Sequence, residues 1–217
     1  MKSLLALLLL LAGCASAPAV PDWRVNAHAA LGNYTAAYFA GRERVARLEL
    51  ARARAEVART GEASQMARVE LVACALEVAS LAATQCPAFQ VLEQDADAAA
   101  RAYADYLAGR WERLDAALLP PAQQGVPASR DALATLSAIE DPLSRLVAAA
   151  LLLRAGRLPP AGIDLAIDTA SQQGWRRPLL AWLSFARDRC KAAGDAACAA
   201  ARQRRIDYVL GSTRPDR

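Results

Sequence analysis

A three-residue motif, Ala-Gly-Arg, constrains the fold of this chain most, because it recurs between stretches that each favour a helix. It occurs at residues 40–42, 108–110 and 155–157, and a variant, Ala-Gly-Asp, occurs at residues 193–195. Glycine readily adopts the left-handed backbone conformation that ends one helix and lets the next turn back. The motif therefore predicts four helical hairpin corners.

The stretches between these corners have the composition of helices. Alanine is abundant, β-branched residues are sparse, and aromatic residues make up only 6% of the chain, so strands are disfavoured. Ala46, Leu50, Ala53 and Val57 recur with the helical period and form one apolar stripe among arginines and glutamates. Residues 146–153 are apolar all round, which predicts the most buried helix. The sequence predicts an all-α protein with helices over residues 24–40, 42–60, 62–82, 88–108, 110–119, 129–139, 142–155, 161–173, 177–193 and 196–210.

The spacing around the first corner points to a known repeat. Gly41 is followed by a small residue after five positions, a larger apolar one after nine and a small one after twelve, namely Ala46, Leu50 and Ala53. Gly41 and Gly109 lie 68 residues apart (109−41), which is twice 34. This pattern resembles the tetratricopeptide repeat, a pair of helices about 34 residues long. The resemblance implies a degenerate helical-hairpin array, a tetratricopeptide-like α-solenoid, and the alternative is an irregular helical bundle.

The first residues have the features of an export signal. Lys2 precedes an apolar run over residues 4–11, which as a helix would be about 12 Å long, whereas a bilayer core is about 30 Å thick. The run is too short to span a membrane and is typical of a signal peptide. Cleavage in the Ala-Ser-Ala stretch at residues 15–17 is one alternative.

The residues that follow the apolar run, Leu-Ala-Gly-Cys at positions 11–14, resemble the lipobox of bacterial lipoproteins. The resemblance implies that Cys14 becomes the mature N-terminus and carries three acyl chains, enough for a lasting membrane anchor. Ala15 in the next position implies sorting to the outer membrane of a Gram-negative cell.

These features divide the chain into four parts. We expect a lipoprotein signal peptide over residues 1–13, the lipidated Cys14 and a tether over residues 14–22, an all-helical domain over residues 23–211, and a disordered tail over residues 212–217. The proline-containing stretch 120–128 is a possible subdivision of the helical domain.

Four further cysteines fit an oxidising compartment. Cys190 and Cys198 lie four residues before and four residues after Gly194, so a hairpin corner there would bring them within disulfide distance. Cys74 and Cys86 would be about 18 Å apart on one continuous helix. Their disulfide requires the helix to break near Ser80, and two buried thiols are the alternative.

Charged and catalytic residue types give little sign of chemistry. The net charge is +4, and an exported protein does not normally meet nucleic acid, so no nucleic-acid partner is expected. The basic stretch 42–59 is either a solvated helix face or a contact with anionic lipid. His28 is the only histidine and has no catalytic partner pattern, and no metal-ligand spacing is present. We therefore predict a protein that is not an enzyme and has no cofactor other than its covalent lipid.

Several aspartates fit helix capping. Asp141 and Asp195 precede expected helices and are typical N-caps. Asp95 and Asp97 could together hold a calcium ion, but a capping or solvated role fits their position near a helix start better.

Aromatic residues near two of the glycine corners have helical spacing and allow two interpretations. They either line the concave side of the array and receive a partner peptide, or they pack in the core. The residues are Tyr34, Tyr38, Tyr103, Tyr106 and Trp111.

The sequence as a whole predicts a lipid-anchored, non-catalytic scaffold or adaptor for envelope-protein assembly, on the periplasmic side of the outer membrane. Its expected partners are the membrane and an envelope protein. A pilotin-like secretin assembly factor and an adaptor of peptidoglycan enzymes are two forms of this role, although this comparison rests on fold class. A cell-wall enzyme or small-molecule binder with an unrecognised site is the alternative.

Overall fold

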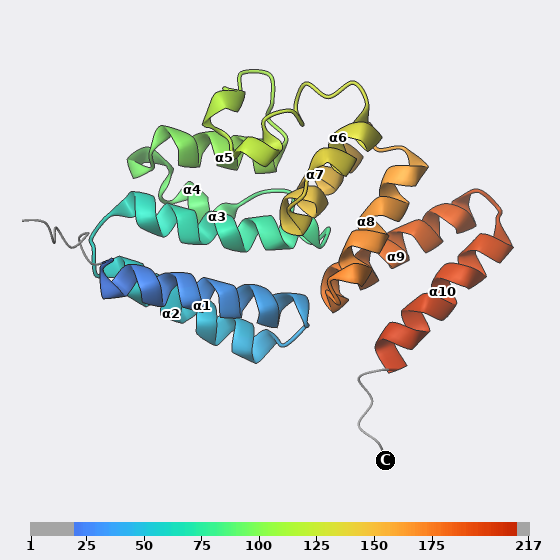
Figure 1. Cartoon of the computed structure of the whole chain (residues 1–217), viewed down its shortest axis with the longest axis horizontal. Helices are drawn as coiled ribbons and strands as arrows, with labels where there is room; N and C mark the ends of the chain where they lie inside the picture. The colour runs from blue at the N-terminus through green and yellow to red at the C-terminus, as the bar shows by residue number, and fades with distance from the viewer. Residues whose placement is uncertain (1–19, 212–217) are drawn as a thin grey trace, which may run out of the picture.

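A computed structural model describes residues 20–211 of the chain, and this part is all-α, with ten α-helices, three short 3-10 helices and no strand (Figure 1). The predicted fold class is therefore confirmed. The predicted signal peptide, Cys14, most of the tether and the predicted tail lie outside the described residues. The α-helices are α1 (Asp22–Phe39), α2 (Glu43–Ala58), α3 (Ala63–Ala79), α4 (Pro87–Gln90), α5 (Ala98–Ala108), α6 (Ala132–Ala138), α7 (Pro142–Arg154), α8 (Pro160–Gln172), α9 (Arg176–Ala192) and α10 (Ala196–Gly211), and the 3-10 helices are η1 (Glu93–Asp95), η2 (Ala116–Leu118) and η3 (Pro121–Gln123).

The helices follow one another as a row of hairpins with one long interruption. Helices α1 and α2 form the first hairpin, α7 and α8 a second, and α9 and α10 the last (Figure 1). Helix α3 packs on the first hairpin and also directly on α7, although residues 80–141 separate α3 from α7 in the chain. Those intervening residues form α4, α5, α6 and the 3-10 helices; α4 and α5 pack on α3, whereas α6 packs on α7 and α8 (Figure 1).

All four glycine corners have the same backbone geometry. The glycines are left-handed, with φ between 68° and 76° at Gly41, Gly109, Gly156 and Gly194. The residue after each glycine donates its N–H to the carbonyl five residues earlier, at 2.8–2.9 Å. This is the hydrogen bond of a Schellman helix end. Three of the corners connect hairpins as predicted, whereas Gly109 ends α5 without starting a new helix.

The predicted helix over residues 110–119 is wrong. Residues 110–115 are turns and irregular chain, and only the short η2 follows. Trp111 folds back onto α5, where its Nε1–H donates to the carbonyl of Tyr106 at 3.1 Å. This contact holds the chain beside the helix that it has just left, and Pro120 and Pro121 then prevent a regular helix from continuing.

The predicted helix over residues 88–108 is also wrong in its first half. It is divided into α4, η1 and α5. The Asp97 carboxylate accepts the N–H of Ala100 at 2.7 Å and so begins α5 there. Cys86 lies immediately before α4 and is joined to Cys74 on α3, which holds α4 against α3.

Helix α7 lies at the centre of the core. Every residue from Leu146 to Leu152 has at most 2% of its surface exposed. Helices α3, α6 and α8 pack around it. The prediction that residues 146–153 form the most buried helix is thus confirmed in its main part.

Arginines hold the carboxyl ends of several helices. The last carbonyls of a helix have no partner within it and carry partial negative charge. Arg145 donates to the carbonyl of Ile139 at 2.6 Å, after α6, and Arg154 donates to the carbonyl of Leu107 in α5. Arg177 of α9 donates to the carbonyl of Tyr38 in α1 at 2.8 Å. The first bond joins two consecutive helices, and the other two join elements that are far apart in the sequence and position them relative to one another.

Both expected cysteine pairs lie at disulfide distance. The Cα atoms of Cys190 and Cys198 are 5.7 Å apart on the facing helices α9 and α10. Those of Cys74 and Cys86 are 5.5 Å apart. Helix α3 ends at Ala79 with Ser80 as its C-cap, so the chain can turn back toward Cys74. The break that the second pair required is therefore present.

Candidate partner-binding cleft

Three of the five aromatic candidates are core residues. Tyr34, Tyr38 and Tyr106 have 4%, 7% and 0% of their surface exposed. Tyr38 lies under the guanidinium of Arg177, 4.2 Å from the ring centroid. The hypothesis that these three tyrosines receive a partner peptide is corrected, since their faces are already covered by the protein.

Tyr103 and Trp111 keep part of their surface exposed, at the two ends of a row of stacked rings. The centroid of Tyr106 is 5.9 Å from that of Tyr103 and 6.2 Å from that of Trp111. The guanidinium of Arg157 lies 5.6 Å from the Trp111 ring. Tyr106 thus supports both outer rings, which face different hollows of the surface.

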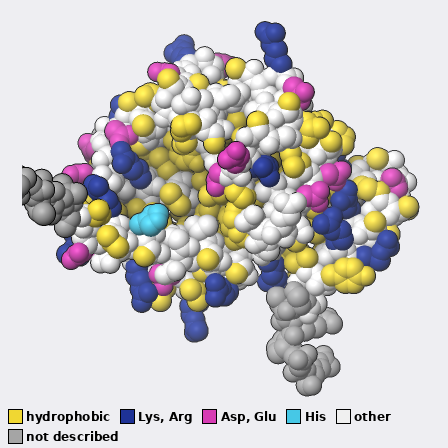
Figure 2. All heavy atoms as spheres, in the orientation of Figure 1, with side chains coloured by type: hydrophobic (Ala, Val, Ile, Leu, Met, Phe, Trp, Pro, Cys, Tyr) yellow, Lys and Arg dark blue, Asp and Glu magenta, His cyan; other side chains and the backbone are white. Residues whose placement is uncertain are grey.

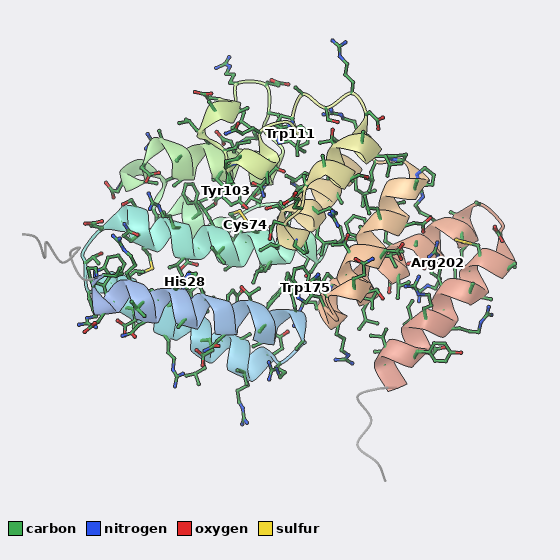
Figure 3. All side chains as sticks on the ribbon, in the orientation of Figure 1. His28, Cys74, Tyr103, Trp111, Trp175 and Arg202 are labelled. Carbon is green, nitrogen blue, oxygen red and sulfur yellow. A yellow bond between two sulfur atoms is a disulfide. The ribbon has the colours of Figure 1, made fainter. Side chains whose placement is uncertain are left out.

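Tyr103 lines a hollow of about 370 Å³ that we call the apolar cleft. Figure 2 shows hydrophobic side chains gathered in a depression on this face, and Figure 3 labels Tyr103 beside it, between α3 and α5. The α3, α5 and 118–120 segments each provide part of its wall. The residues that form its apolar lining include Leu71, Val72, Ala100, Tyr103, Leu118 and Leu119.

An ion pair lies at the rim of the apolar cleft. Arg68, which also lines it, donates to the Asp97 carboxylate at 2.8 Å. Hydrogen bonds from the Ala100 N–H, which has the larger effect, and from Arg68 lower the pKa of Asp97. Asp97 therefore remains ionised at neutral pH, and the rim charges are paired while the interior is apolar.

The hydroxyl of Tyr103 lies toward the protein interior. Burial is the main cause that raises its pKa, and Gln123 partly offsets this by hydrogen bonding. Gln123 is itself only 2% exposed, and its Oε1 accepts no hydrogen bond within the described part of the chain. Tyr103 thus contributes a ring to the cleft wall and remains a neutral phenol at physiological pH.

Trp111 lines a different and more polar hollow of about 410 Å³. This hollow lies at the carboxyl end of α5 and includes Gln85, Arg110 and Arg154. Burial lowers the pKa of Arg154. Arg110 is paired with Asp105 at 2.6 Å. The structure therefore does not bring Tyr103 and Trp111 to one binding surface.

Two of the three residues considered for chemistry lie apart from the apolar cleft, and the third, Asp97, stands at its rim. His28 is exposed on α1, as Figures 2 and 3 show, and Asp95 is exposed in η1. Asp97 has the capping role that its position suggested. Within residues 20–211 no three metal-ligating side chains come together. No helix in that range is long and apolar enough to cross a bilayer.

Sequence reasoning missed most of the cleft lining. Leu118 and Leu119 precede two prolines, and the sequence pattern predicts them at the end of a helix that does not form. A pair of leucines directly before a proline pair was the one available signal, because it places apolar side chains where regular structure must end.

No protein-family model matches the chain, and no curated protein or solved structure matches it either. The sequence motifs and the geometry of the cleft are therefore the basis for the functional proposal.

Proposed function

We propose that this protein is a lipid-anchored, non-catalytic adaptor on the periplasmic face of the outer membrane, which binds an envelope protein through the apolar cleft. The observation that carries the binding role is the cleft itself, an apolar hollow with its rim charges already paired. A pilotin-like secretin assembly factor or an adaptor of peptidoglycan enzymes would each use such a surface.

The cleft fits the apolar face of a partner helix. Such a helix binds by placing side chains from successive turns into a hydrophobic groove. The volume of about 370 Å³ has room for only a few apolar side chains. Leu118 is 39% exposed at the edge, so it offers apolar surface that a partner would cover. A few buried anchors of this kind commonly supply most of the binding free energy.

The anchor is supported by the sequence Leu-Ala-Gly-Cys at residues 11–14, which lies outside the described part of the structure. The lipid anchor is tested by measuring the mass of the N-terminal peptide of the mature protein. We expect that peptide to begin at Cys14 and to carry added acyl mass. A mature chain that begins at another residue, or a Cys14 without acyl mass, would contradict the lipid anchor.

The adaptor role is tested by crosslinking in cells. A photoreactive amino acid at Val72, which lines the apolar cleft, should capture a specific envelope protein. The substitution Leu118→Asp should abolish this capture, because a carboxylate would have to be buried under the partner. The matched control is Val91→Asp, a residue that is 79% exposed but lies outside the cleft. Equal capture by both variants would show that the cleft is not the contact.

A small-molecule binder is the second candidate, because the cleft volume falls within the range of about 300–1,000 Å³ typical of ligand pockets. Native mass spectrometry of the purified protein distinguishes the two. A bound small molecule that Leu118→Asp removes would favour this candidate. Loss of function on alanine replacement of His28 or Asp95, with folding intact, would instead favour an enzyme, whereas Asp97 is unsuitable for this test because it pairs with Arg68 at the rim of the cleft.

A further inference from the structure

The charge of the chain is divided by position along the row of helices. Residues 22–59, the first hairpin, contain seven arginines and four acidic residues. Residues 60–175 contain eight arginines and fourteen acidic residues, and residues 176–211 contain eight basic and three acidic residues. The two terminal hairpins are therefore basic and the middle of the molecule is acidic.

In the first hairpin, three of the seven arginines, Arg44, Arg47 and Arg52, lie on the uncovered side of α2. Helix α2 buries Ala46, Ala53 and Val57 against its neighbours. The opposite side, which we call the α2 outer face, is exposed and consists of Arg44, Arg47, Leu48, Ala51 and Arg52. Figure 2 shows basic side chains projecting along this lower edge of the molecule.

The α2 outer face combines unpaired cations with apolar surface. Within residues 20–211, neither Arg44 nor Arg47 forms an ion pair, while Arg52 binds Glu49, whose side chain is 9% exposed. Leu48 is 53% exposed and the adjacent Val45 is 40% exposed. Arginines around exposed aliphatic side chains are the composition of helices that lie in the membrane interface.

We infer that the α2 outer face lies on the anionic phospholipid headgroups of the membrane that holds the anchor. The inference rests on the proposed lipid anchor for its geometry. Only five residues, 15–19, separate Cys14 from Val20, and the six steps from one Cα to the next can extend at most about 21 Å. The first hairpin, which begins at Asp22, is therefore kept close to the bilayer.

Charge and apolar area both favour this lipid surface as the occupant. Arginines near an anionic leaflet are attracted to its surface potential, and Leu48 can enter the boundary between headgroups and acyl chains. The last hairpin is also basic, but it lies at the opposite end of the row from the start of α1 (Figure 1). It therefore supplies a matched control with similar charge.

The test measures vesicle binding without the anchor. The whole mature chain, residues 14–217 with Cys14→Ala, is exported behind a cleavable secretory leader and sedimented with vesicles. One set of vesicles contains phosphatidylglycerol and phosphatidylcholine, and the other contains phosphatidylcholine alone. Binding is compared at about 0.01 M and about 0.15 M salt, where the Debye lengths are about 30 Å and 8 Å. We expect binding to the anionic vesicles only, and weaker binding at the higher salt.

Two triple variants locate the contact. Arg44→Gln, Arg47→Gln and Arg52→Gln together should weaken binding about a hundredfold, because each arginine contributes roughly fivefold near an anionic surface. The control Arg189→Gln, Lys191→Gln and Arg204→Gln removes the same charge from exposed residues of α9 and α10. An equal or larger loss in the control would overturn the inference, as would tight binding to phosphatidylcholine vesicles or no binding to anionic ones.

Two single substitutions test the same contact in case the triple variant does not fold. Leu48→Asp should also weaken binding to the anionic vesicles, whereas Val91→Asp should weaken it less, although both introduce one negative charge at an exposed aliphatic residue. Equal effects would mean that Leu48 does not enter the lipid interface. Because these proteins carry no acyl chain, failure of vesicle binding is distinguishable from failure of the lipid anchor, which the mass of the Cys14 peptide reports separately.

Discussion

The most direct test of the fold is Trp182→Phe. The Trp182 ring is fully buried on α9, and its Nε1–H donates to the carbonyl of Ala79 at the end of α3, at 3.1 Å. Phenylalanine would leave this buried carbonyl without a partner, at a cost of about 1–3 kcal/mol. The smaller ring also leaves a cavity of roughly 40 Å³, which costs about 1 kcal/mol more. We therefore expect the free energy of unfolding to fall by about 2–4 kcal/mol.

The measurement is urea unfolding followed by far-UV circular dichroism, since tryptophan fluorescence would change with the substitution itself. The matched control is Trp23→Phe, because Trp23 is partly exposed on α1. We expect the control to lose less than about 1 kcal/mol. A loss for Trp182→Phe no greater than that of the control would refute the contact between α9 and α3. The urea dependence should keep its slope in both variants, since neither changes the surface exposed on unfolding much.

Three further predictions concern local structure. Gly41→Ala should lower the free energy of unfolding by about 1 kcal/mol, because Gly41 has a φ of 76° that alanine adopts only with strain. Gly32→Ala within α1 should raise the free energy of unfolding by about 0.5–1 kcal/mol, because alanine favours the helix and has space there. Thermal unfolding of the two variants should therefore shift in opposite directions. Burial raises the pKa of Glu77 in the folded protein. The free energy of unfolding therefore falls as the pH rises from the ordinary pKa of this carboxyl to the raised one, because the folded state disfavours the ionised form. Glu77→Gln should therefore raise the free energy of unfolding at pH 7. Chemical unfolding measured over a range of pH should show no difference between this variant and the unchanged protein below the ordinary Glu77 pKa of 4.5. Replacing Cys190 and Cys198 by serine, which opens a link across 8 residues, should cost about 2.5 kcal/mol in chemical unfolding without dithiothreitol.

Features set by a few neighbouring residues could be predicted from the sequence. The glycine corners have one geometry because only glycine adopts their positive φ without strain. Asp141 and Asp195 cap α7 and α10 as expected, accepting the backbone N–H three residues later. Each of these contacts lies within five residues of the chain, so the pattern of residue types is enough to define it.

The segment after α3 could not be predicted in the same way. Its residues have good helix propensity, and propensity is a weak guide where tertiary contacts compete with it. The Cys86 link to α3 and the contact of Trp111 with the carbonyl of Tyr106 both oppose a continuous helix. Neither can be read from spacing alone.

The apolar cleft was beyond sequence reasoning because three separate segments form it. Leu71 comes from α3, Tyr103 from α5, and Leu119 from the chain before η3. The helical spacing of Tyr103 and Tyr106 was visible, but the sequence did not show that Tyr106 is fully buried while Tyr103 reaches the surface. The side of a helix that stays open depends on what packs beside it, which in this case is a distant part of the chain.

The direct packing of α3 on α7 has an evolutionary consequence. Since the helices on either side of residues 80–141 already touch, part of the contact between the two blocks of hairpins does not pass through that segment. Substitutions at its exposed residues, such as Leu118, can alter the shape of the cleft while α3 and α7 stay packed on each other. Selection for a new binding partner can therefore act on the exposed surface of this one segment while its buried residues keep the core intact.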